Sequence, residues 1–130
     1  WDPAAQDVHG LSRNYLADHG EPPEQVARRM HEELAGKKVY TDAPDFDGFW
    51  CRRLFDACRI ECSIQFTDIQ VLLKELLPVD YWLTSSTGRV EIYSLYEQAR
   101  EKCGLEAHRA ENDVAYLLEL YRISSKLGGY

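Results

Sequence analysis

Apolar residues recur along this chain at intervals of three and four, and this spacing predicts helices almost throughout. A narrow stripe of Val26, Met30 and Leu34 predicts one of them, with Pro23 in its first turn. Alternation of apolar and polar residues, which is typical of strands, is confined to residues 89–92. The pattern therefore predicts an all-α protein, a compact bundle of about four to six helices.

Apolar residues become denser after residue 48, where a single helical face can be followed over several turns. This face is expected to hold Trp50, Cys51, Leu54, Phe55, Cys58 and Cys62. Asp47 precedes it and is expected to cap the helix, because a carboxylate accepts hydrogen bonds from the free amides there.

Two parts of the chain differ in their apolar content. Residues 1–46 are poor in core residues, and their first short helix is expected to start with Asp2 as its cap and Pro3 in its first turn. A proline, a glycine and three aspartates predict a loop at 37–48. We therefore expect a loosely packed N-terminal arm with one or two short helices at 1–46, and a helical core domain at 47–130.

Three further helices are expected in the core domain. Residues 67–70 match a capping box, and Pro78 is expected to end the helix that follows. Gly88 is expected in a turn, and Gly104 just after the next helix. The last helix, from Asn112, is apolar on two sides, so one side is expected to face the core and the other a partner. These sides hold Val114, Leu117, Leu118 and Tyr121, and Tyr116, Leu120, Ile123 and Leu127.

The balance of charge narrows the class of partner. The chain carries 15 Lys and Arg against 22 Asp and Glu, a formal net charge of −7. Proteins that bind nucleic acid usually present a basic patch, whereas the short basic clusters here are flanked by acids. No apolar run approaches the roughly 20 residues that cross a bilayer. We expect protein partners, with no nucleic acid and no membrane insertion.

The residues that carry chemistry form no recognisable catalytic or metal-binding motif. The chain has no G-x-S-x-G, no glycine-rich phosphate loop and no H-E-x-x-H. Cys103 and His108, with the acids at 106–113, are a weak candidate for an enzyme site, because no orienting group is evident. The aspartates at 42–47 lack the glutamate that a calcium loop needs. The four histidines are expected as solvated surface groups, and no cofactor or metal is expected.

The four cysteines bear on the compartment. Cys51, Cys58 and Cys62 match no C-x-x-C pair, and Cys103 is remote in sequence. Free cysteine is among the most buried residue types, so we interpret all four as buried, reduced thiols. This usage favours a reducing, intracellular compartment, with the cytoplasm first and an organelle as the alternative.

Two segments resemble known families. Residues 49–128 resemble a death-effector-type module through the stretches FWCRRLF, IQVLLKELL, EIYSLYEQA and YLLELYRISSKL, which implies a helical interaction module. The charged triad of that family is replaced by residues 122–125, so filament assembly does not follow. Residues 82–96 resemble an EF-hand loop with Gly88 at its sixth position. Leu83 and Ser94 stand where carboxylates bind calcium, which implies a degenerate regulatory domain that has lost the metal.

A non-enzymatic protein–protein interaction module, or a subunit of a larger assembly, is the function we predict from the sequence. The alternative is the degenerate EF-hand-type domain. Aromatic residues dominate binding hot spots, so they lead the candidate contacts. These candidates are Trp1, Tyr40, Trp82, Tyr116, Leu120 and Tyr130. The N-terminal arm and the last helix are the expected contact regions.

Overall fold

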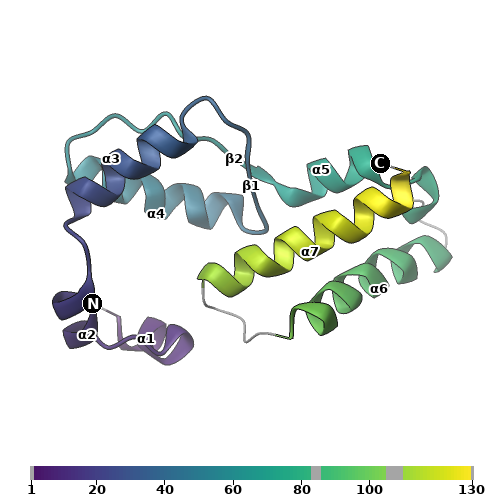
Figure 1. The fold of residues 1–130 in the computed structure, drawn as a ribbon, viewed down its shortest axis with the longest axis horizontal. Coiled ribbons are helices and arrows are strands. Elements are labelled where there is room, and N and C mark those ends of the chain that lie inside the picture. The colour runs from purple at the N-terminus through teal and green to yellow at the C-terminus, as the bar shows by residue number, and fades with distance from the viewer. Residues whose placement is uncertain (1, 83–85, 105–109, 130) are drawn as a thin grey trace. The chain divides into compact units, whose positions relative to one another are not determined.

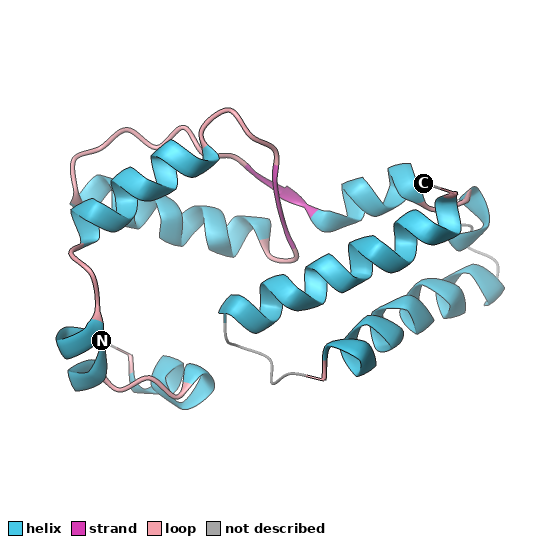
Figure 2. Ribbon diagram, viewed as in Figure 1, coloured by secondary structure: helices cyan, strands magenta, loops and turns pink. Residues whose placement is uncertain are grey.

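A computed structural model describes residues 2–82, 86–104 and 110–129, and only the backbone of residues 86–91. These residues form seven α-helices, a short 3-10 helix and two strands paired as a parallel sheet (Figures 1 and 2). The fold is mostly helical, and the small sheet corrects the all-α expectation. The elements are α1 (Pro3–His9), α2 (Arg13–His19), α3 (Pro23–Leu34), β1 (Val39–Thr41), α4 (Pro44–Ala57), β2 (Phe66–Asp68), α5 (Ile69–Leu76), η1 (Val79–Tyr81), α6 (Ser86–Cys103) and α7 (Ala110–Gly128).

The chain divides into two compact units, residues 1–67 and 68–130. Residue 46, after which the sequence predicts a boundary, lies inside α4, and α4 packs against α3 within the first unit. The expected loop at 37–48 is corrected, since it contains β1 and the start of α4. Three-residue strands carry too little alternation to be recognised from the pattern alone.

The two N-terminal helices are held by local caps. The Asp2 carboxylate accepts a hydrogen bond from the Ala4 amide at 2.9 Å, as the sequence predicts for a helix that opens Asp-Pro. The Ser12 hydroxyl accepts one from the Tyr15 amide at 3.1 Å and caps α2. Neither helix contains a buried residue, so α1 and α2 contribute no core of their own.

The core of the first unit lies between α3 and α4, which run side by side (Figure 1). Its buried members are Ala27, Cys51, Phe55 and Ile64. Met30 and Leu34, from the predicted stripe, pack against them, together with residues of the segment that follows α4. Full burial of a Phe side chain contributes roughly 2–3 kcal/mol, so Phe55 is a principal anchor of this core.

The end of α4 differs from the expectation that one helical face continues to Cys62. The helix ends at Ala57, and Arg59 adopts a left-handed φ of 55°. The Ile60 amide then donates to the Phe55 carbonyl at 3.0 Å, which is the hydrogen bond of a Schellman cap. Glycine usually occupies the left-handed position, and an arginine there gives the sequence no stop signal.

In the described part of the second unit, the core is built from helices and the residue that ends α5. α7 packs against both α5 and α6 and lies between them (Figure 1). The buried residues on these helices and at the end of α5 are Ile69, Leu73, Leu77, Leu95, Ala99, Leu120, Ile123 and Ser124. None of the helices in the described part of the chain is long and apolar enough to cross a bilayer.

The helix boundaries in the second unit agree only in part with those predicted from the sequence. Asp68 caps α5 by accepting from the Gln70 amide at 2.8 Å, so the capping box led by Thr67 is corrected. Gly104 follows α6 with a φ of 60°, as expected. Gly88 lies inside α6 and not in a turn, because the helix already begins at Ser86.

Candidate protein-interaction site

Three aromatic side chains lie exposed on the N-terminal half of α4. Phe46, Phe49 and Trp50 are 65%, 48% and 54% exposed. Their spacing places them on one face of the helix, while Cys51 and Phe55 turn toward the core on the other side. The ring of Trp50 meets those of Phe46 and Phe49 edge-to-face, at centroid distances of 6.2 and 5.3 Å. We call these three residues the aromatic face.

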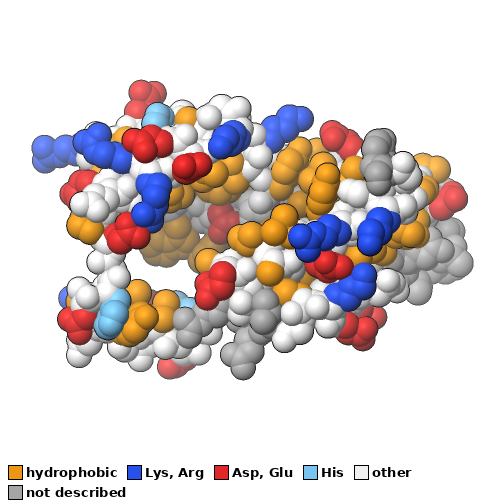
Figure 3. All heavy atoms as spheres, viewed as in Figure 1, with side chains coloured by type: hydrophobic (Ala, Val, Ile, Leu, Met, Phe, Trp, Pro, Cys, Tyr) orange, Lys and Arg blue, Asp and Glu red, His pale blue; other side chains and the backbone are white. Residues whose placement is uncertain are grey.

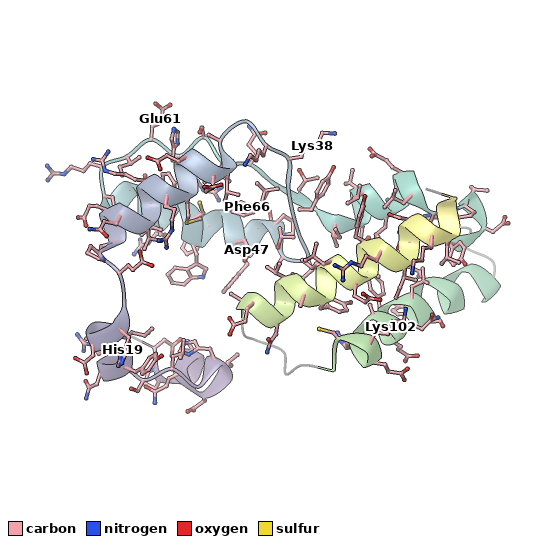
Figure 4. The ribbon with its side chains drawn as sticks, in the orientation of Figure 1. His19, Lys38, Asp47, Glu61, Phe66 and Lys102 are labelled. Carbon is pink, nitrogen blue, oxygen red and sulfur yellow. The ribbon has the colours of Figure 1, made fainter. Side chains whose placement is uncertain are left out.

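An apolar hollow adjoins the aromatic face. Its volume is about 360 Å³, and it is lined by Met30, Asp47, Trp50, Cys51, Leu54 and Phe66. Figure 4 labels Asp47 and Phe66 among these. Figure 3 shows hydrophobic side chains reaching the surface along the lower edge of α4. Trp50 belongs to both features, so the hollow extends the exposed aromatic surface into the unit.

The start of α4, which presents the aromatic face, is fixed by a buried hydroxyl. Thr41 ends β1 and is only 6% exposed. Its hydroxyl donates to the Asp47 carboxylate and accepts from the Ala43 amide at 3.2 Å. Asp47 therefore ties the first turn of α4 to β1, and the expectation that it is the N-cap is corrected, because Ala43 occupies that position.

Acidic residues surround the N-terminal end of the aromatic face. Asp45 and Asp47 lie in the first turn of α4, and Asp42 is exposed just before it. Carboxylates in a first turn stabilise the helix through its dipole. They also give this edge of the aromatic face a negative potential, while Arg53 lies exposed one turn beyond Trp50.

A second apolar stripe is exposed on α7. Val114, Leu118 and Tyr121 are 56%, 49% and 43% exposed and lie on one side of the helix. Leu120 and Ile123 on another side are buried in the core of the second unit. The two-sided pattern of the last helix thus corresponds to one core side and one exposed side.

The six predicted contact residues differ in how far they are exposed. Leu120 is fully buried, which corrects its assignment to an interface, because the two apolar sides of α7 look alike in sequence. Tyr40, Trp82 and Tyr116 are half-buried. The Lys74 ammonium lies 5.6 Å from the centroid of the Trp82 ring, and the Arg100 guanidinium lies 5.7 Å from the centroid of the Tyr116 ring. Trp1 and Tyr130 lie outside the described residues.

Sequence reasoning missed the aromatic face. The sequence pattern predicts a loop at Phe46 and places Trp50 on the same helical face as Cys51 and Phe55. The signal that was available is the F-x-x-F-W spacing at residues 46–50, which places all three rings on one helical face.

The residues considered for chemistry do not converge in the described part of the chain. The Cys103 thiol lies 3.9 Å from the Asn112 carbonyl, and His108 is outside the described residues. His19 and His31 are exposed as predicted, whereas His9 is half-buried and accepts from the Leu11 amide at 2.9 Å. No group of three or more His, Cys, Asp or Glu that could hold a metal occurs among the residues described.

The EF-hand-like segment is not a loop where its backbone is described. Residues 86–96 lie within α6, which removes the loop geometry that a cation site of this kind requires.

Comparison with known proteins finds no matching protein family, no matching curated protein and no matching solved structure. The surfaces of the two units therefore provide the argument for function.

Proposed function

We propose that this protein is a non-enzymatic interaction module that binds an amphipathic segment of a partner protein through the aromatic face of α4. The observation that supports this most is a set of three adjacent exposed rings beside an apolar hollow. Aromatic residues are enriched in protein interfaces and at their energetic hot spots. Trp50 is the expected centre of the contact, because it borders the hollow and touches both phenylalanines.

The charges around the site indicate which kind of partner segment it would bind. Asp42, Asp45 and Asp47 lie at one end of the aromatic face, and the whole chain carries a net charge of −7. A segment with lysine or arginine next to its apolar residues is complementary to this surface. An amphipathic helix offers such a pattern, with apolar anchors at intervals of three and four residues. One anchor side chain would enter the hollow lined by Leu54 and Phe66.

The exposed stripe of Val114, Leu118 and Tyr121 supports a role in a larger assembly, because it offers a second apolar contact on the other unit. The α4 site does not depend on it. A truncation in this stripe is therefore a control for truncations in the aromatic face.

Selection from two displayed libraries of helical peptides tests the proposal. Both libraries carry apolar residues at helical spacing, one with Lys and Arg at the flanking positions and the other with Glu. We expect the full chain to enrich the basic library, and calorimetry to show affinity that falls as salt is raised.

Two variants test where the peptide binds. Each of them truncates one half-exposed apolar side chain. Trp50→Ala should weaken the selected peptide by about 30-fold or more, the loss typical of a hot-spot residue. Leu118→Ala should leave the affinity within about twofold, since Leu118 lies on the second unit. No enrichment, enrichment of the Glu library, or a larger loss from Leu118→Ala than from Trp50→Ala would refute the proposed site.

A further inference from the structure

Two cysteine thiols meet in the core of the first unit. The sulfur of Cys51 lies 3.7 Å from the sulfur of Cys62, and both are free thiols. Cys51 is on the buried side of α4 and only 6% exposed, whereas Cys62 is half-buried in the irregular segment between α4 and β2.

The contact arises from the way in which α4 ends. Residues 51 and 62 would stand about 16 Å apart along a continuous helix, at 1.5 Å per residue. The reversal at Arg59, with its left-handed φ, instead returns the chain along α4. Ile60 and Ile64, on either side of Cys62, pack into the same core as Cys51 and hold the returning segment there.

We propose that Cys51 and Cys62 are a reversible modification site, at which an intramolecular disulfide forms in exchange with a low-molecular-weight disulfide. A protein disulfide has its sulfurs about 2.05 Å apart, so the two must approach by less than 2 Å. Cys62 supplies this movement, because it lies outside helix and strand while Cys51 is fixed within α4. The proposal does not rest on the binding function suggested for the aromatic face, although Cys51 also lines the hollow beside it.

The exchange proceeds in two balanced steps. The Cys62 thiolate first attacks one sulfur of the small disulfide, forms a mixed disulfide with it, and releases the other half as a thiolate that takes up a proton. The Cys51 thiolate then attacks the Cys62 sulfur and releases the second half as a thiol. The two protein thiols together lose two electrons and two protons, and the small disulfide gains them as two thiols.

The exposure of the two thiols explains why Cys62 reacts before Cys51. The thiolate is the reactive form of cysteine, and burial, followed by the hydrogen bond with Cys62, raises the pKa of Cys51 to about 11. Cys62 is the more exposed partner and therefore meets the reagent first. Cys51 then acts as the resolving thiol inside the core. This second step should accelerate as the pH rises toward the pKa of Cys51.

Peptide mapping tests the pairing directly. The native, full chain is incubated with oxidised glutathione at pH 8, its remaining thiols are alkylated, and it is cut with trypsin. Cleavage after Lys and Arg separates the cysteines into peptides 39–52, 54–59, 60–74 and 103–109. We expect peptides 39–52 and 60–74 to be linked, with the mass of two hydrogen atoms lost. Free thiols should fall from four to two, and a reductant should restore them.

Two serine variants at half-buried thiols provide the matched control. Cys62→Ser should abolish the link, whereas Cys58→Ser should leave its yield unchanged within about twofold. Circular dichroism confirms that each variant is folded before oxidation. A dominant link through Cys58 or Cys103, a product that stops at the glutathione adduct, or a link that forms only in denaturant would each overturn the proposal.

Discussion

The two units build their cores in different ways. In the second unit three helices pack directly, with α7 between α5 and α6. In the first unit two helices make only part of the core, and the irregular segment after α4 completes it with Ile60 and Ile64. A core made of helices alone is encoded by periodicity, whereas a core closed by a returning segment depends on single backbone positions such as Arg59.

The largest expected losses of stability come from truncating one buried side chain in the core of each unit. Phe55→Ala should cost about 3–5 kcal/mol, because it leaves a cavity at a fully buried site of the first unit. Leu120→Ala should cost about 2–5 kcal/mol in the second unit for the same reason. Hydrogen exchange should rise in residues 23–67 for the first variant and in 68–129 for the second. A rise in both units for either variant would show that the two unfold together.

Two polar side chains are buried among the residues that the structure describes, and their substitutions should act in opposite directions. The Thr41 hydroxyl in the first unit is hydrogen-bonded to Asp47 and to the Ala43 amide, so Thr41→Val should cost about 1–2 kcal/mol. The Ser124 hydroxyl is fully buried without a hydrogen-bond partner in the described part of the chain. Ser124→Ala should therefore stabilise by about 1 kcal/mol. Urea unfolding measures both, and a loss of stability in Ser124→Ala would contradict this account.

A smaller effect is expected where the two units end a helix with a left-handed residue. Arg59 holds this conformation after α4, and Gly104 holds it after α6. Arg59→Gly should stabilise the first unit by about 0.5–1 kcal/mol, because glycine adopts a positive φ without steric cost. Gly104→Ala should destabilise the second unit by about 1 kcal/mol. Thermal unfolding of the two variants shows the direction of each stability change. Changes in the same direction would exclude the left-handed backbone as their cause.

The smallest effect concerns an exposed ion pair of the first unit. The Arg29 guanidinium donates two hydrogen bonds to Glu21, at 2.8 and 2.9 Å, and these hydrogen bonds lower the pKa of that carboxyl. The pair therefore stabilises above the ordinary Glu pKa of 4.5, and this contribution is lost as the pH falls through the lowered value. An NMR titration should give Glu21 a pKa below that of Glu21 in an Arg29→Gln variant. High salt should reduce the difference.

Some helix boundaries could be predicted from the sequence, whereas the starts of α4, α5 and α6 could not. Asp2 with Pro3, and Pro23, mark helix starts by residue type alone, and Gly104 marks an end in the same way. These signals are local, since each depends on one side chain and the backbone beside it.

The features that could not be predicted depend on contacts between residues that are far apart in the sequence. β1 exists because it pairs with β2, which lies about 25 residues further along, and neither strand has a pattern of its own. The orientation of α4 depends on which of its sides packs against Ala27, so the sequence does not show that Trp50 is exposed while Cys51 is buried. Of the candidate surfaces, the exposed second side of α7 was predicted, whereas the three exposed rings of α4 were not.

The position of Trp50 gives the protein an optical reporter of its own. An exposed indole emits at longer wavelength than one shielded from water, so an occupant of the neighbouring hollow should shift the emission to the blue. The chain has three tryptophans, and replacing Trp1 and Trp82 with phenylalanine would leave Trp50 as the sole emitter. Screening for partners could then follow fluorescence on the unlabelled chain.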